Sequence, residues 1–159
     1  MTNRKADKKG LIDACKELGV IPLVRNPLDG GLASGRYTAT NPSGGEAAGA
    51  AKFPFEKLEK LQPLHSVQET VAERASTRVK REQRDMNDRY RARYGPAPKI
   101  NTDISTTQVA INYVIAKGAV PLCEVTDSKQ ADEVLGCLGW GLSEEEVDML
   151  DSAATLCDL

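Results

Sequence analysis

The sequence predicts a helix-rich α/β protein with parallel strands. Helical and strand-like segments alternate along the 159 residues, in the order helix, strand, long helical excursion, strand, helix, helix. The two strand-like runs, at 20–24 and 119–123, are short and apolar, and each follows a helix that ends at a glycine, Gly19 or Gly118. Such alternation is typical of sheets whose parallel strands are joined by helices. Two strands are too few to form a closed sheet.

The first helix is predicted at 6–18, where apolar residues recur at helical spacing and Gly19 can cap the end. The run 20–24 then indicates a short buried strand. Pro22 restricts it to an edge or distorted strand, because proline cannot donate a ladder hydrogen bond. The stretch 27–49 is rich in Gly, Pro, Ser and Asn, so it is predicted to be a loop. Loops of this length are usually functional or mobile.

The middle of the chain predicts helices of two kinds. Short helical segments are expected at 55–64 and 67–75. The segment 74–93 is strongly charged and predicts a solvated helix with charges of both signs, which ends before Pro96 and Pro98. Acidic residues interrupt its basic run, so a surface helix or docking arm is favoured over a nucleic-acid patch.

The C-terminal part predicts three helices around the second strand. Ser105 or Thr106 can cap a helix that ends at Gly118. This helix is apolar nearly all round, so it should be buried on more than one side. A further helix is expected at 128–138. Ser143 opens the last helix with a capping box. The inner face of that helix is predicted to hold Val147, Met149, Leu150 and Ala154.

Composition argues against several classes of function. The net charge of −2 creates no field that attracts nucleic acid or membranes. The longest apolar run, 109–116, is too short to span a bilayer, and the polar N-terminal segment lacks the apolar region of a signal peptide. The only histidine, His65, is remote in sequence from the cysteines, so we expect reduced thiols and no metal site. The four scattered cysteines are Cys15, Cys123, Cys137 and Cys157.

Three stretches of the chain resemble the aldo-keto reductase family, in the family's order and spacing. They are GLIDACKELGV at 10–20 with NPLDGGL at 26–32 and GRY at 35–37, TQVAINY at 107–113, and AVPL at 119–122 with QA at 130–131, LGCLGW at 135–140 and LSEEEV at 142–147. The plant and algal plastid reductases are the most similar type.

The resemblance implies part of a (β/α)8 TIM barrel, namely the last two βα units and the terminal helix. On this expectation residues 1–159 form a single truncated domain, in which a divergent charged insertion occupies about 74–104. Such a fragment leaves both strand edges unpaired and one face of the sheet bare. Unpaired edges and bare apolar faces invite pairing with another chain. We therefore expect other protein chains of a larger complex to cover the exposed strands.

The resemblance also implies an NADPH-dependent reductase chemistry that this chain alone lacks. Family members reduce a carbonyl with an Asp, a Tyr, a Lys and a His, all in the first half of the barrel and upstream of the matched stretches. Without them no general acid is present for the carbonyl oxygen, so no catalytic residue is expected here. The residues that do not match the family's Tyr or His are Tyr37, Tyr90, Tyr94, Tyr113 and His65.

The family's cofactor-binding residues match at three positions, Leu28, Gln130 and Glu133. Around them the pattern is eroded. Arg25 lies where relatives carry an aromatic residue that stacks on the nicotinamide. Glu124 lies where relatives have a small turn, and Thr126 lies where they have a cation for the 2′-phosphate. The carboxylates of Glu124 and Asp127 would repel a phosphate-rich ligand. The three matches are therefore interpreted as helix and loop packing, with no cofactor bound. NADP is expected only if the chain belongs to an active reductase.

Three functions are compatible with these residues. The favoured one is a non-catalytic, aldo-keto-reductase-like accessory or structural subunit of a larger protein assembly. The alternative is an NADPH-dependent carbonyl reductase whose N-terminal half lies outside this sequence. A third is a small binding or regulatory module that keeps a weakened nucleotide site at Gln130 and Glu133. Similarity to plastid reductases favours a plastid or chloroplast location, with the cytoplasm as the other possibility.

Overall fold

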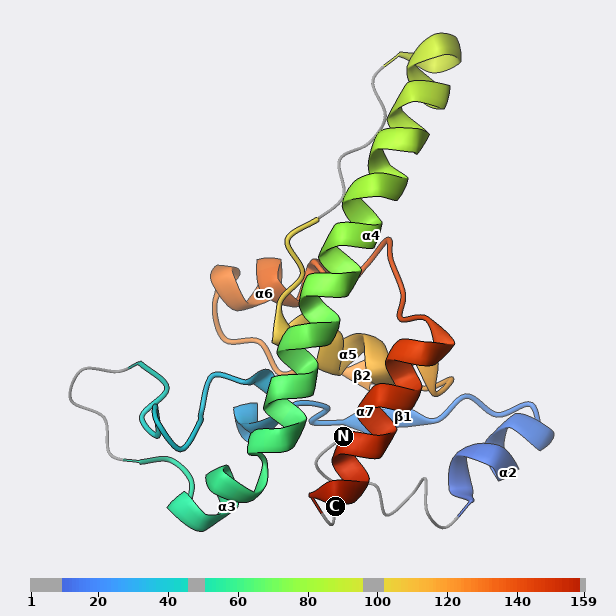
Figure 1. The fold of residues 1–159 in the computed structure, drawn as a ribbon. Helices are drawn as coiled ribbons and strands as arrows, with labels where there is room; N and C mark the ends of the chain where they lie inside the picture. Colours follow the sequence, from blue (N-terminus) through green and yellow to red (C-terminus); the bar gives the residue numbers. More distant parts are fainter. Residues whose placement is uncertain (1–9, 46–50, 96–101, 158–159) are drawn as a thin grey trace.

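A computed structural model describes residues 10–45, 51–95 and 102–157 of the protein. It is a helix-rich α/β arrangement (Figure 1), so the predicted alternation of helix and strand is confirmed. The elements in chain order are α2 (Leu11–Glu17), β1 (Leu23–Arg25), the 3₁₀ helix η1 (Asp29–Ser34), α3 (Phe55–Lys60), α4 (Gln62–Tyr94), α5 (Thr106–Ala116), β2 (Val120–Leu122), α6 (Ser128–Leu135) and α7 (Glu144–Leu156).

The sheet consists of β1 and β2, which pair in parallel with Leu23 opposite Val120, as predicted. Each strand is shorter than its predicted run. Pro22 lies just before β1, and its carbonyl accepts a hydrogen bond from the Val120 backbone N–H at 2.9 Å. The prediction that both strands are buried is wrong, since the first and last residues of each are exposed. No third strand pairs with this sheet within the described residues, and the side chains of Leu23, Val120 and Leu122 are exposed.

The central helix is α5, which packs against α4, η1, α6 and β2. Ser105 is its N-cap and forms a complete capping box with Gln108. All residues at 108–114 are buried, so the predicted burial on more than one side is confirmed. The helix ends just before Gly118, whose φ of 86° places it in the left-handed region that glycine adopts without strain. Local sequence signals therefore define both ends of this helix.

Helix α4 differs most from the expectation. It is one continuous helix of 33 residues, where separate helical segments were predicted at 67–75 and 74–93. Its second half projects from the rest of the protein, whereas its first half lies beside α5 and α7 (Figure 1). The prediction that 74–93 is a solvated helix is therefore wrong for the first two turns of that segment. It is right for residues 80–89, which are mostly exposed. The apolar residues that α4 buries include Leu64, Val71, Ala72, Ala75 and Val79.

The last two helices largely follow the prediction. Ser143 caps α7 and forms the expected capping box with Glu146. Leu150 and Ala154 on its inner face are fully buried. Helix α6 ends at Leu135, earlier than the predicted end at 138, because the chain turns there. Helix α7 packs against α4, whereas α6 packs against α5 and has no fully buried residue.

The loop predicted at 27–49 begins with an ordered element, η1, that belongs to the core. Leu32 and Ala33 of η1 are fully buried. Two buried side chains of α4 hold this segment. The Nε2 of His65 bonds to the Leu32 carbonyl at 3.0 Å, and the side-chain amide of Gln68 donates to the Ala33 carbonyl at 2.9 Å. Long-range hydrogen bonds thus fix the start of a segment that composition identifies only as loop.

Burial of His65 makes the stability of the fold depend on pH. Burial lowers the pKa of this imidazole from its usual 6.5, because a buried site disfavours the charged form. Below pH 6.5 the unfolded chain therefore binds a proton that the folded chain resists. We expect the free energy of unfolding to fall as the pH drops from 6.5, by up to about 1.4 kcal/mol per pH unit.

Urea denaturation of the wild type and of His65→Gln between pH 7 and about pH 5 measures this slope, in a range where most carboxylates remain ionised. Glutamine keeps a donor for the Leu32 carbonyl and removes the titration. The free energy of unfolding of the variant should therefore depend less steeply on pH. An equal slope in both proteins would contradict this assignment.

Candidate functional site

The candidate site lies at the carboxyl ends of the two parallel strands. β1 ends at Arg25 and β2 ends at Leu122, and these residues are partners in the register. The loops that follow, 26–28 and 123–127, therefore leave the same edge of the sheet. In α/β folds, ligands bind at this edge. The sequence-predicted site residues all come from these loops or from α6 just beyond them.

The N-terminus of α6 is capped by a carboxylate of the protein itself. Asp127 accepts hydrogen bonds from the backbone N–H and from the side-chain amide of Gln130, both at 2.9 Å. The Gln130 side-chain oxygen in turn accepts from the backbone N–H of Thr126 at 3.2 Å. A helix N-terminus attracts anions through its free N–H groups and its dipole. Here the anion at that position is Asp127.

Glu133 lies one turn after Gln130 and connects α6 to α5. Its carboxylate accepts a short hydrogen bond from the Ser105 hydroxyl, the N-cap of α5. Its backbone carbonyl accepts from the side-chain amide of Gln108 at 3.1 Å. Both partners belong to the capping box of α5. Glu133 therefore holds the two helices together in this structure.

Leu28 stands apart from the other two matched residues. Its backbone carbonyl accepts from the N–H groups of Gly31 and Ala33, both at 3.0 Å, and so begins η1. Its side chain packs against the hydrophobic core. The structure thus brings Gln130 and Glu133 together on α6 and leaves Leu28 as a packing residue. Arg25, at the end of β1, is exposed.

An apolar cavity of about 480 Å³ opens between α5, β2 and α6. Cys123 and Cys137 also line it. Burial raises the pKa of both thiols, and the proximity of Cys137 raises the pKa of Cys123 further. Both cysteines are therefore protonated and weakly nucleophilic at neutral pH. The apolar side chains around the cavity include Ile111, Ile115, Val120, Val125, Leu135 and Leu138.

All four cysteines are free thiols. Within residues 10–45, 51–95 and 102–157, no group of three or more His, Cys, Asp or Glu side chains is arranged to hold a metal ion. None of the helices described combines the length and the apolar character that crossing a bilayer requires.

Sequence reasoning missed a polar cluster between α5 and α7. The Tyr113 hydroxyl donates a short hydrogen bond to the Asp151 carboxylate, and the Lys117 ammonium lies 2.7 Å from the other carboxylate oxygen. Lys117 also lies 5.3 Å from the centre of the Tyr113 ring. The four-residue spacing of Tyr113 and Lys117 places them on one helix face. No local signal indicated Asp151 as their partner, because it lies 34 residues beyond Lys117.

The fold and the site together define the class. Parallel strands, each followed by a helical connection, with the candidate site at their carboxyl ends and a helix at the C-terminus, are the features of a helix-rich α/β protein built from βα units. The aldo/keto reductase family model matches residues 1–155 of the sequence, so the chain belongs to this family.

One curated relative is the chloroplastic pyridoxal reductase of Arabidopsis thaliana, which is 26% identical over 140 residues. The match covers 88% of this chain and 30% of the relative, so the chain spans less than a third of that protein's length. No solved structure matches the chain.

Proposed function

We propose that this chain acts as a non-catalytic, aldo-keto-reductase-like subunit within a larger protein assembly. The observation that carries the proposal is the position of Asp127. This carboxylate caps the helix that, by resemblance, carries the cofactor contacts of the family. A phosphate-bearing cofactor placed there would meet a fixed negative charge at the helix N-terminus.

The hydrogen bonds of the matched residues support the same conclusion. The Gln130 side chain is engaged with Asp127 and Thr126, and the Glu133 carboxylate is engaged with Ser105. A cofactor could bind these groups only by displacing contacts that hold α6 in place. The residues present therefore do not fit NADP, and the matched positions act as structural residues of the subunit.

The exposed sheet supports a place in an assembly. Leu23 is 65% exposed and Leu122 is 47% exposed, although both belong to strands. Val20, Ile21 and Val120 beside them are also exposed. A bare apolar sheet with free edges is stabilised when another polypeptide covers it. In this proposal β1 and β2 are the last strands of a partial (β/α)8 barrel, residues 74–104 are a divergent insertion in one domain, and partner chains cover the sheet.

The alternative is an NADPH-dependent carbonyl reductase whose N-terminal half lies outside this sequence. The coverage of the pyridoxal reductase favours it, because the matched part is only 30% of that relative. In that case strands of the same polypeptide would cover β1 and β2. The third reading, a regulatory module with a weakened nucleotide site, would require Gln130 and Glu133 to bind the nucleotide.

Titration of the chain with NADPH in a calorimeter tests the proposal. We expect no saturable heat up to about 1 mM, because the carboxylates repel the phosphates. Asp127→Ser is the matched variant, since serine is also a good N-cap but carries no charge. Any binding gained by this variant would identify the Asp127 charge as the obstacle.

The size of the native protein is the second part of this test. In an extract of the source cells we expect the chain to migrate well above its own 17.2 kDa in size-exclusion chromatography. Micromolar NADPH binding by the wild type would support the reductase alternative, and its loss on changing Gln130 and Glu133 would support the regulatory module. A native monomer would overturn the subunit proposal.

In this proposal the chain has the same cellular location as its relative. The chloroplastic pyridoxal reductase supports a plastid as the site of the assembly, and the cytoplasm is the alternative. Fractionation of the source cells, with the chain followed by an antibody, distinguishes the two compartments.

A further inference from the structure

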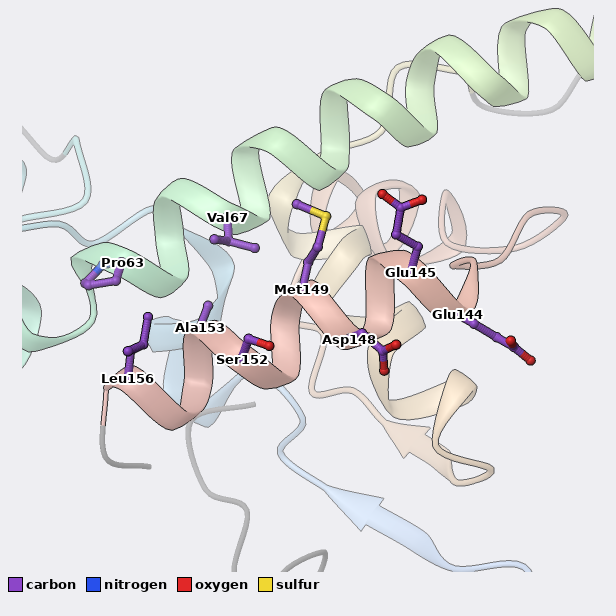
Figure 2. Close-up of a pocket in the computed structure, with 9 residues that line it drawn as sticks. All are labelled: Pro63, Val67, Glu144, Glu145, Asp148, Met149, Ser152, Ala153 and Leu156. Atoms are coloured by element: carbon purple, nitrogen blue, oxygen red, sulfur yellow. The ribbon is translucent and has the colours of Figure 1, made fainter.

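A groove of about 640 Å³ runs between the first half of α4 and the outer side of α7. Figure 2 shows Pro63 and Val67 on α4, with Met149 and Leu156 of α7 directed toward that helix. Ala153 lies between them. The groove extends along α7 from Glu144 to Leu156, which is about 18 Å at the helical rise of 1.5 Å per residue. It is thus about three helical turns long.

The floor of this groove is formed by Met149 and Ala153 of α7 and by Val67 of α4, which also contact the core. The inner face of α7 already buries Leu150 and Ala154 against the core. Val67 and Met149 are only half-buried, and Leu156 is 79% exposed. Pro63 and Leu156 are exposed, and together with the half-buried Val67 and Met149 they form an apolar strip that the described fold covers only in part. Such strips mark protein interfaces.

One end of the groove is acidic. Glu144, Glu145 and Asp148 line it, and Glu145 pairs with Arg74 at 3.0 Å. Glu144 and Asp148 have no ion-pair partner among the residues described. The capping of α7 does not require either of them, since Ser143 and Glu146 complete the capping box. Their charge is therefore free to act on a ligand.

We propose that this groove binds an amphipathic helix with lysine or arginine residues, supplied by a partner protein. An apolar strip three turns long matches the apolar stripe of such a helix, which repeats at i, i+3, i+4 and i+7. The acidic end complements its cations and sets its direction in the groove. Acidic residues at this position disfavour nucleic acid. This inference does not rest on the proposed function, because it concerns α4 and α7, away from the sheet.

The projecting half of α4 in a second copy is a poorer occupant. It carries many basic residues, but Met86 is the one large apolar side chain described between 80 and 89. A helix of that kind offers charge without an apolar stripe. The apolar floor would then stay exposed to water.

The experiment uses fluorescence anisotropy with a labelled peptide of about 15 residues, built from leucine at helical spacing and lysine elsewhere. A matched peptide carries glutamate in place of lysine. We expect saturable, salt-sensitive binding of the lysine peptide and at least about tenfold weaker binding of the glutamate peptide.

Variants locate the binding surface. Glu144→Lys with Asp148→Lys should weaken the lysine peptide about tenfold, and Leu156→Asp should do the same through loss of the apolar contact. Both changes are at exposed positions, so the fold should survive, as circular dichroism can verify. Glu59→Lys, an exposed site on α3, is the control and should leave the affinity unchanged.

Three outcomes would overturn the inference. The first is equal affinity for the two peptides, and the second is unchanged affinity in the groove variants. The third is sedimentation showing a dimer that Leu156→Asp dissociates, because the groove would then be filled by a second copy of this chain.

Discussion

An alanine in place of Leu64 is expected to lower the free energy of unfolding by about 2–5 kcal/mol. Leu64 lies in the first turn of α4 and is fully buried in the hydrophobic core. The change removes buried apolar area and leaves a cavity that its neighbours cannot fill completely. Its neighbour in sequence, His65, is bonded to η1, so α4 is anchored there and cannot easily move to close the gap. Urea denaturation followed by circular dichroism measures the loss.

Leu135→Ala is the matched control, because the chemical change is the same at a site that is 59% exposed. We expect an effect within about 0.5 kcal/mol there. A loss at Leu64 no larger than at Leu135 would show that α4 is not part of the cooperative core. The comparison matters because α4 contributes much of the buried apolar surface.

Loss of the Asp151 carboxylate is expected to destabilise the protein by about 2–3 kcal/mol. In Asp151→Ala, Lys117, whose side chain is 21% exposed, loses the carboxylate oxygen that lies 2.7 Å from its ammonium. The buried Tyr113 hydroxyl loses its acceptor at the same time. Removal of one member of a partly buried ion pair leaves the other charge less well compensated, so the effect exceeds that of a surface ion pair.

A double-mutant cycle separates these contributions. Tyr113→Phe removes only the hydroxyl, and we expect a coupling of about 0.5–3 kcal/mol between it and Asp151→Ala. Asp148→Ala, an exposed carboxylate on the same helix, should change stability by about 0.5 kcal/mol or less. Additive losses for Tyr113→Phe and Asp151→Ala would show that the two side chains are not energetically coupled.

The sequence predicted much of the fold because the signals are local. The side chains of Ser105 and Ser143 cap helices through N–H groups three residues away. Gly19 and Gly118 end helices because both adopt a positive φ. The parallel pairing of two strands followed from the helical connection between them. Each of these features depends on a few neighbouring residues or on chain order.

The prediction for α4 failed for a physical reason. The high charge of 74–93 predicts a solvated helix, yet Ala75 and Val79 in that segment are buried because α4 packs against α5 and α7. Gln68 can be buried because the carbonyl of Ala33, 35 residues earlier, accepts its amide. Such a partner is not visible in local sequence.

The candidate site likewise combines residues that are recognisable in the sequence with contacts that are not. Carboxylates at 124 and 127 and the matches at Leu28, Gln130 and Glu133 were apparent from the sequence. The sequence could not show that Glu133 bonds to Ser105, 28 residues away, or that Gln130 is tied to Asp127. That these residues contact no cofactor is the prediction that the NADPH titration tests.

Residue identity, contacts within about one helical turn and chain order are enough to indicate the family resemblance, the capped helix ends at Ser105 and Ser143, the parallel strands and the charges beside the sheet. Which apolar residues are covered depends on contacts between distant segments. Val71 of α4 is buried and Leu23 of β1 is exposed, although both are apolar residues in regular elements. Burial depends on what the rest of the chain places against a side chain, and contacts between distant segments are not written in any local pattern.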